Sequence, residues 1–194
     1  MKIAIILPAI DIGGPQNLIN ALVNEFLSLK HEVKIFYFDD KTGTQFNCAT
    51  ERISFWDYQK LSQFDVIHTH GIRPDLFGFI HKGKWKAKLV TTIHSYLKDD
   101  LGFLYGKLGG LFFLYVWNFI LLRHHKIVLL SKHMQAYYQS IFWNKKQSYV
   151  YNCTTLNNEY IPDLSTEVLQ KLTELQAKYK VLGSICYMLK RKGL

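Results

Sequence analysis

Apolar and polar residues follow two different periods along the chain, and residues 1–29 contain both of them. Residues 2–7 (KIAIIL) form a continuous apolar run of strand length, and the loop after them carries the glycine pair Gly13 and Gly14. Pro15 follows, at a position that the first turn of a helix tolerates. Between residues 16 and 29, apolar side chains recur at helical spacing. The pattern predicts the first βα unit of a parallel α/β sheet.

The same succession of strand and helix patterns continues to about residue 152. Further strands are expected at residues 31–38, 53–55, 65–69, 87–93, 127–130 and 148–151. Further helices are expected at residues 56–63, 73–82 and 132–142. This alternation is typical of the α/β class, and it predicts a Rossmann-like, doubly wound parallel sheet.

Residues 108–122 (LGGLFFLYVWNFILL) stand apart because they carry no charge and place aromatic rings in every direction of a helix. The stretch is shorter than the ~20 apolar residues that a membrane span needs. Two interpretations stay open. A helix that is apolar all round is typically buried, whereas an aromatic helix with basic residues at its ends, here Lys107 and Arg123, can lie in the surface of a bilayer.

The pattern changes after residue 152, so we expect residues 1–152 to form one domain and residues 153–163 (CTTLNNEYIPD) to be a polar linker. An amphipathic helix is expected at residues 164–179, with Ser165 or Thr166 as its N-cap. A strand follows at 180–187, and then a basic turn with Lys190 and Lys192. Residues 164–194 therefore suggest the start of a second Rossmann-like domain that is truncated.

The formal charge of +9, from 24 basic and 15 acidic residues, favours anionic partners. No nucleic-acid-binding motif accompanies it, so no nucleic-acid partner is expected. The three cysteines are widely spaced and are interpreted as free thiols in a reducing compartment. No signal peptide is recognised, which predicts a cytoplasmic protein. His124 and His125 lack a third ligand at metal spacing, and no metal site is expected.

Polar or small residues follow several of the expected strands, and ligands of open parallel sheets bind beyond the carboxyl ends of the strands. Any one of them can instead serve a turn or a helix cap, and Ser131 is a natural N-cap. Histidines at such ends can donate to a sugar hydroxyl or a phosphate, or transfer a proton near neutral pH. The candidates at this edge are Gly13, Gly14, His70, Arg73, His94 and Ser131.

Other chemistries fit poorly. The loop spacing is Gly-Gly and not G-x-G-x-x-G, and Asp39 is the only acidic residue that could bind a ribose after the second strand. Both observations argue against a nucleotide-dependent oxidoreductase. The chain has no G-x-S-x-G elbow, no H-E-x-x-H and no Walker loop.

Several stretches, taken in their order and spacing, resemble the N-terminal half of retaining glycosyltransferases of family 4. These enzymes have the GT-B fold, in which two Rossmann-like domains enclose the active site. The matching stretches are residues 2–36, 65–79 (DVIHTHGIRPDLFGF), 88–96 (KLVTTIHSY), 126–134 (KIVLLSKHM), 149–152 (YVYN) and 182–194 (LGSICYMLKRKGL).

The resemblance implies a role for each candidate. Gly13 and Gly14 would face the acceptor and the donor phosphates, and His70 with Arg73 would line the acceptor side. His94 would act as the catalytic histidine near the transferred sugar. On the donor side, Lys192, with Lys190, would contact the donor pyrophosphate, as basic groups stabilise a leaving phosphate.

The resemblance also implies the reaction. Such enzymes transfer a sugar from a nucleotide sugar, without metal or other cofactor, to a glycan or lipid-linked acceptor in cell-surface polysaccharide synthesis. Many act at the inner face of the cytoplasmic membrane, and the charge and residues 108–122 suit contact with anionic lipid. The pair of glutamates that binds the donor in this family is not in the chain, so the chain alone is expected to be inactive. The alternative is a non-catalytic module that docks on a membrane or works with a partner subunit.

Overall fold

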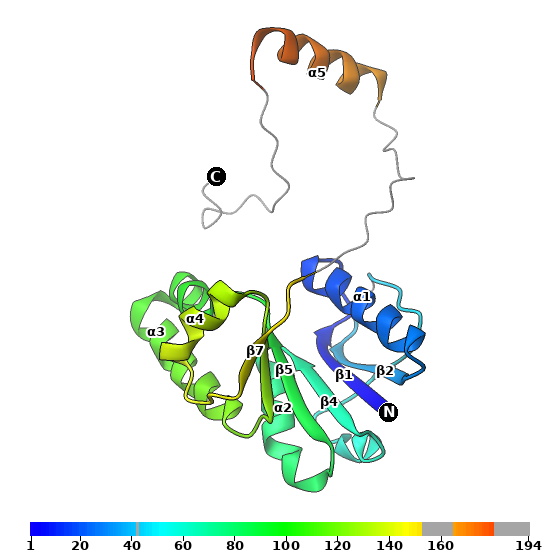
Figure 1. The fold of residues 1–194 in the computed structure, drawn as a ribbon, viewed down its shortest axis with the longest axis vertical. Coiled ribbons are helices and arrows are strands. Elements are labelled where there is room, and N and C mark those ends of the chain that lie inside the picture. The colour runs from blue at the N-terminus through cyan, green and yellow to red at the C-terminus, as the bar shows by residue number, and fades with distance from the viewer. Residues whose placement is uncertain (42, 153–164, 181–194) are drawn as a thin grey trace. The chain divides into compact units, whose positions relative to one another are not determined.

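The computed structural model describes residues 1–41, 43–152 and 165–180, and the chain divides into two units, Met1–Thr154 and Thr155–Leu194. The first unit is built on a seven-stranded parallel sheet (Figure 1). Its strands are β1 (Lys2–Ala9), β2 (Glu32–Asp39), β3 (Ala49–Arg52), β4 (Val66–His70), β5 (Lys88–Ile93), β6 (Lys126–Leu129) and β7 (Gln147–Tyr149). Its helices are α1 (Gly14–Ser28), α2 (Ile72–His81), α3 (Leu97–Leu121) and α4 (Lys132–Ile141), with short 3₁₀ turns at Tyr58–Leu61 and Lys82–Lys84.

The strand order is β3-β2-β1-β4-β5-β6-β7, so the chain winds outward from β1 in one direction and then from β4 in the other. The connections leave a switch point between the carboxyl ends of β1 and β4, which is where open α/β sheets bind ligands. The doubly wound, Rossmann-like fold predicted from the sequence is thereby confirmed.

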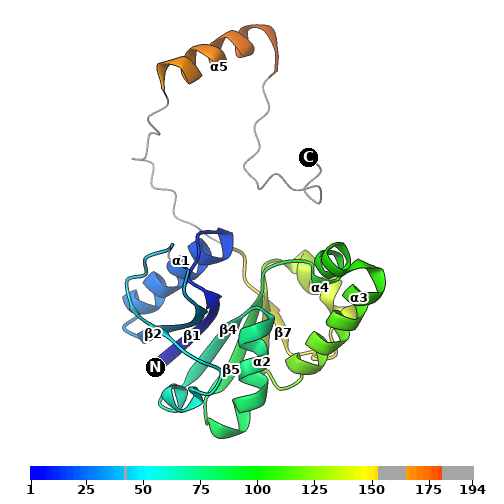
Figure 2. The same ribbon diagram turned by 180° about the vertical axis from the view of Figure 1, so that it is seen from behind.

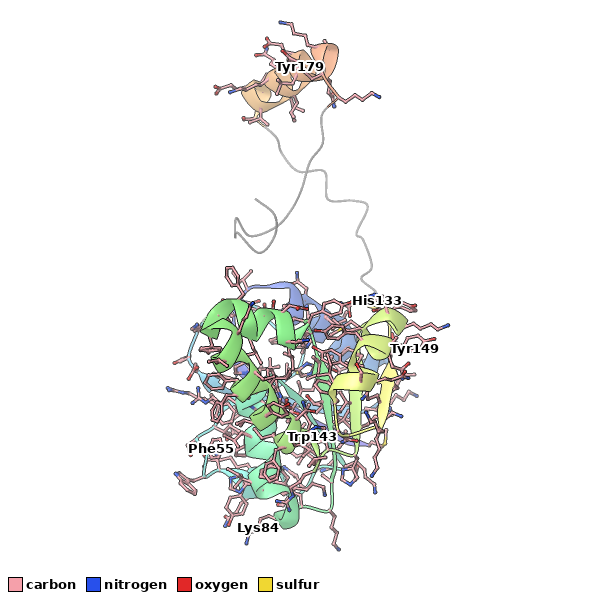
Figure 3. All side chains as sticks on the ribbon, turned by 90° about the vertical axis from the view of Figure 1, so that its left-hand side faces the viewer. Phe55, Lys84, His133, Trp143, Tyr149 and Tyr179 are labelled. Atoms are coloured by element: carbon pink, nitrogen blue, oxygen red, sulfur yellow. The ribbon has the colours of Figure 1, made fainter. Side chains whose placement is uncertain are left out.

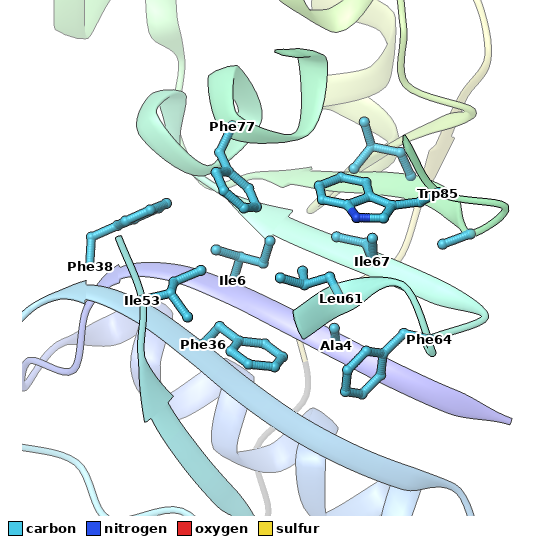
Figure 4. Close-up of a cluster of buried hydrophobic side chains, with 12 residues drawn as sticks. Ala4, Ile6, Phe36, Phe38, Ile53, Leu61, Phe64, Ile67, Phe77 and Trp85 are labelled. Carbon is cyan, nitrogen blue, oxygen red and sulfur yellow. The ribbon is translucent and has the colours of Figure 1, made fainter. Parts of the chain in front are cut away.

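The core lies on both faces of this sheet, and β1 contributes to each. Ile5 packs with Ile19 and Val23 of α1 on one face. On the other face, Ile6 packs in a cluster with Phe77 of α2 and with aromatic side chains from neighbouring strands and loops (Figure 4). Views from opposite sides show α1 and α2 on opposite faces (Figures 1 and 2). Burial on both faces explains the unbroken apolar run of this strand.

Two short elements differ from the expectation. The strand expected at 53–55 is β3, Ala49–Arg52, and the helix expected at 56–63 is a single 3₁₀ turn. Because β3 is an edge strand whose side chains are exposed or half-buried, it carries no apolar alternation. Ile53, which follows it, is in the core and provided the misleading signal.

The apolar stretch 108–122 is the second part of α3, whose backbone leaves helical geometry at Gly106 (φ 72°, ψ 174°). One side is buried, as Leu114, Trp117 and Leu121 show. The other side is not, and Leu108 is 86% exposed and Phe112 63% exposed. The buried interpretation therefore holds for one face only. The sequence could not show this, because a stretch without charges gives no sign of which face points outward.

In the second unit the structure describes one helix, α5 (Thr166–Lys178). Ser165 is its N-cap, and its side chain accepts a hydrogen bond from the backbone N–H of Val168, which settles the choice left between Ser165 and Thr166. The expected linker at 153–163, residues 181–187 of the expected strand, and Lys190 and Lys192 lie outside the described residues, and Lys180 is not part of a strand.

Candidate functional site

The loops after β1, β4, β5 and β6 meet at one edge, because all these strands run parallel. Gly13 is the N-cap residue of α1 in an extended conformation, and Pro15 lies in the first turn as predicted. No described side chain caps that turn, and a Cβ added to Gly14 would meet nothing within 4 Å. The backbone N–H groups at the start of α1 therefore lie open to an anion.

Gly71 joins β4 to α2 with a φ of 95°, a conformation that L side chains rarely adopt. It lets the chain turn directly from His70 into the helix. The positive φ explains why this position requires glycine.

The histidines at the ends of β4 and β5 meet. Nδ1 of His70 lies 2.8 Å from Nε2 of His94, and His70 is only 3% exposed. His68, two residues earlier on the same face of β4, stacks at a tilt on His70 and lies 2.8 Å from Oγ1 of Thr92. Sequence reasoning singled out His70 and His94 but missed His68, although its i, i+2 spacing from His70 was the available signal.

Burial controls the protonation of this cluster. Loss of solvation lowers the pKa of His68 and of His94 to about 4, and the pKa of His70 lies well below the usual 6.5. The carboxylate of Asp75 opposes the effect at His68 and His94, but does not overcome it. At neutral pH the three rings are therefore neutral, so they act as hydrogen-bond donors and acceptors and not as cations.

Behind β4 lies a polar network that the sequence did not reveal. The carboxylate of Asp75 is fully buried and accepts hydrogen bonds from Oγ1 of Thr69 at 2.5 Å and from Nε1 of Trp117 at 2.8 Å. Nε2 of His124 lies 3.4 Å from the same carboxylate. These partners come from α2, β4, α3 and the turn after α3, and they are too far apart in sequence for any motif to link them.

Arg73 lies on α2 at the surface, away from the histidine contact. Its guanidinium pairs with Oδ1 of Asp39 at 2.7 Å and lies over the ring of Phe38 at 4.7 Å. The pair joins the start of α2 to the carboxyl end of β2. Asp39, the acidic residue considered for a ribose, is thus engaged by Arg73.

Ser131 caps α4, because its Oγ accepts a hydrogen bond from the backbone N–H of Met134 at 3.0 Å. The hydroxyl of Tyr138 donates to the carbonyl of Ser95 and accepts from the N–H of Leu97, both at 2.6 Å, which fixes the loop after His94. His133, at the start of α4, lies at the carboxyl edge of the sheet, and Lys84 lies at the opposite edge (Figure 3).

Within the described ranges, no three or more His, Cys, Asp or Glu side chains are grouped to hold a metal ion.

A doubly wound sheet with open N–H groups at its switch point, and with paired histidines at the ends of the neighbouring strands β4 and β5, defines a Rossmann-like domain, and this fold is also found in GT-B glycosyltransferases. Residues 12–157 match Glycosyltransferase Family 4, and the chain belongs to this family.

Individual proteins agree with this assignment. The chain is 35% identical over 159 residues to the O-antigen biosynthesis glycosyltransferase WclY of Escherichia coli, which covers 78% of this chain and 44% of that protein. Its fold resembles that of Anabaena Alr3699/HepE in complex with UDP-glucose (TM-score 0.68, 15% identity, 91% of this chain and 50% of that chain). It also resembles the fold of sucrose-phosphate synthase from Thermosynechococcus elongatus (TM-score 0.63, 17% identity, 79% of this chain and 48% of that chain). The chain therefore spans about half the length of these proteins or less.

Proposed function

We propose that this chain is the acceptor-side half of a retaining glycosyltransferase of the hexosyltransferase type. The complete enzyme would move a sugar from a nucleotide sugar to a glycan or lipid-linked acceptor in cell-surface polysaccharide synthesis. The family assignment supports sugar transfer, the name of the Escherichia coli relative supports a role in O-antigen synthesis, and the Anabaena complex supports a nucleotide-sugar donor. The observation that carries the proposal is the His70–His94 pair at the carboxyl ends of β4 and β5, beside the switch point.

In this proposal the oxygen of the acceptor hydroxyl forms a bond to the anomeric carbon of the sugar, and the bond from that carbon to the donor phosphate oxygen breaks. The proton of the hydroxyl passes to the departing phosphate oxygen. The N–H groups at Gly13 and Gly14 bind a donor or acceptor oxygen, and His94 binds the sugar or its phosphate. Arg73 and Ser131 line the acceptor side, and His70 holds the ring of His94. Lys190 and Lys192 stabilise the departing nucleotide. No metal or organic cofactor takes part.

The test is a chimera in which this chain replaces the matching 159 residues of WclY from Escherichia coli. We expect the chimera to transfer sugar, and His94→Ala to lower the rate by about 10²-fold, a typical loss for a group that contacts the reacting centre. His31→Ala, at the other end of the sheet, is the matched control and should leave the rate unchanged. An unchanged rate in His94→Ala would remove His94 from the mechanism.

The half-enzyme part of the proposal has its own test. The 194-residue chain alone, mixed with nucleotide sugars and a lipid-linked acceptor, should release no nucleotide. Turnover by the isolated chain would contradict it. A chimera that folds but transfers no sugar from any donor would contradict the proposed function as a whole.

A second proposal concerns where the enzyme works. We propose that α3 rests on the anionic inner face of the cytoplasmic membrane. Among the described residues, Leu97–Leu121 is one helix that is long and apolar enough to cross a membrane by length and composition, and a third of its most apolar window is buried. The break at Gly106 and the buried side of α3 favour a helix that lies on a bilayer over one that crosses it.

The exposed side of α3 has the composition of such a contact. Apolar side chains that are at least a third exposed run along the helix. Lys98 and Lys107 are basic residues on it, Asp99 and Asp100 are acidic residues in its first turn, and Arg123, after its end, donates to the carbonyl of Phe79. The exposed apolar residues are Phe103, Leu104, Tyr105, Leu108, Leu111, Phe112, Tyr115, Val116 and Phe119.

Co-sedimentation with vesicles tests this second proposal. The chain should bind vesicles that contain phosphatidylglycerol, and binding should weaken with salt, because the Debye length falls to ~10 Å at 0.1 M. Phe112→Ser combined with Phe119→Ser should abolish binding, whereas Trp56→Ser, an exposed aromatic residue outside α3, should not. Equal binding by the double variant and the control would refute the assignment of α3.

A further inference from the structure

The contact between His70 and His94 uses one ring nitrogen of each residue. His70 offers Nδ1 and His94 offers Nε2, at 2.8 Å. The second nitrogen of His70, Nε2, is buried and has no hydrogen-bond partner among the described residues. The second nitrogen of His94, Nδ1, is not among the buried unpartnered atoms of the described chain, and His94 is only half-buried. Nδ1 of His94 is therefore the nitrogen that remains accessible at the carboxyl edge.

A neutral imidazole carries one proton, so one ring of the pair donates and the other accepts. Both rings are neutral at pH 7, because burial lowers the pKa of each. If His94 donated from Nε2, His70 would hold its own proton on Nε2, as a buried N–H without an acceptor. If His70 donates from Nδ1, its buried Nε2 is only an unused acceptor. Orphaned buried N–H groups are rarer than under-used acceptors, so the second arrangement is favoured.

We propose that His70 is a positioning residue that fixes His94 as the Nδ1–H tautomer, so that His94 presents a hydrogen-bond donor to its ligand. A donor at that place suits a sugar hydroxyl oxygen or a phosphate oxygen. A free histidine side chain prefers to carry its proton on Nε2, so the contact selects the less common form. That the ligand is a nucleotide sugar or its acceptor rests on the proposed function, whereas the tautomer does not.

Long-range ¹H–¹⁵N correlation spectra of the histidine-labelled 194-residue chain at pH 7.5 test the tautomer directly. Two histidines provide internal references for the Nε2–H form. Nε2 of His81 must donate to the carbonyl of Phe55 at 2.9 Å, and Nδ1 of His125 must accept from the N–H of Leu89 at 2.9 Å. We expect His70 and His94 to show the opposite, Nδ1–H pattern. An Nε2–H pattern at His94 would overturn the proposal.

His70→Leu removes the donor and should return His94 to the Nε2–H form. Thr92→Val is the matched control, because Thr92 lies opposite His70 on the neighbouring strand β5, and the change removes the partner of His68 while leaving both rings of the His70–His94 contact in place. A His94 that keeps its Nδ1–H pattern in His70→Leu, with the His81 and His125 patterns intact, would refute a positioning role. If His70→Leu does not fold, the N–N scalar coupling across the hydrogen bond in the wild-type chain decides whether the contact exists.

The WclY chimera adds a readout that a merely structural role would not move. His70→Leu should lower kcat about tenfold at an unchanged KM for the acceptor, and it should cost nothing further in the His94→Ala background, because the two residues act as one unit. Additive losses would overturn the positioning role. A chimera without any transfer would contradict the proposed function, while the spectra would still decide the tautomer.

Discussion

The two faces of β4 carry polar side chains in opposite situations. Thr69 points toward α2, where it and Trp117 both donate to the buried carboxylate of Asp75. His68 and His70 point toward the face that α1 covers, and His70 keeps a buried nitrogen without a described partner. One strand thus separates a fully buried network, in which Nδ1 of His124 also has no partner among the described residues, from a cluster that reaches the carboxyl edge through the half-buried ring of His94.

The difference distinguishes a structural role from a functional one. A buried polar network with its hydrogen bonds made holds elements in register and costs free energy when one member is removed. A cluster that reaches the edge with an accessible ring nitrogen, as at His94, keeps hydrogen-bonding capacity for a ligand. The Asp75 network joins β4, α2 and α3 beneath the site, and the histidines face the edge where a ligand arrives. Each prediction below acts on one face of β4 or on the edge beside it.

The largest effect is expected from Asp75→Ala. The change leaves the N–H of Trp117 buried without its acceptor, removes one of the two acceptors of Thr69, whose hydroxyl also contacts the carbonyl of Val90 at 3.1 Å, and opens a cavity. We expect the free energy of unfolding to fall by about 4 kcal/mol, measured by urea denaturation followed by circular dichroism.

Asp75→Asn is the matched control for shape. It keeps one acceptor oxygen but turns an amide N–H toward the other donor, so its loss should be smaller than that of Asp75→Ala. A loss below about 1 kcal/mol in Asp75→Ala would mean that the network does not hold the fold.

Lowering the pH should destabilise the protein through the histidine cluster on the other face of β4. The native rings of His68 and His94 stay neutral until pH falls to about 4, whereas the unfolded rings take up protons near 6.5. The unfolded state binds more protons in between, so stability is complete above pH 6.5 and is lost as pH falls toward 4. The loss is about 3 kcal/mol for His68 alone.

Urea denaturation at a series of pH values measures this slope, and His68→Gln should flatten it. The carboxylates of Glu51 and Asp57 also have lowered pKa values, through hydrogen bonds from Lys34 and from Ser54 respectively. Their protonation lowers the free energy of unfolding only below pH 4.5 and 3.8, the ordinary pKa values of the two groups. A stability that is flat from pH 6.5 to 4.5 would contradict the buried, neutral histidines.

Ser131→Ala tests whether a predicted ligand residue is a cap. Loss of the hydrogen bond from Met134 should lower the free energy of unfolding by about 1 kcal/mol. The histidine spectra should stay unchanged. A variant of full stability that raises the KM for the acceptor would instead assign Ser131 to the substrate.

The smallest effect on folding is expected from His70→Leu. Replacing a buried, partly unsatisfied ring by an apolar side chain should change the free energy of unfolding by less than about 1 kcal/mol, in either direction. The comparison is therefore sharpest between this variant and Asp75→Ala. A loss in His70→Leu as large as in Asp75→Ala would remove the distinction between the two faces.

The sequence by itself determined the fold class and most strand ends. The apolar run of residues 2–7, the turn at Gly13–Pro15 and the repeated strand–helix alternation predict β1, α1 and the parallel sheet, because local periodicity reflects burial on one or two faces. A parallel sheet brings its carboxyl ends to one edge, so the sequence placed His70 and His94 at the same edge but did not predict their contact. Edge strand β3 escaped this reasoning, since its exposed residues carry no burial pattern.

Only the tertiary structure decided which polar side chains meet and which are left open. The Asp75–Trp117 contact joins residues 42 positions apart, and its partners lie on elements whose packing no local pattern encodes. The same holds for the two sides of α3, where a charge-free stretch marks no outer face. Sequence periodicity reports whether a side chain is buried, whereas the identity of its neighbour depends on how distant elements pack. That packing places the Asp75 network on one face of β4 and the histidine cluster on the other.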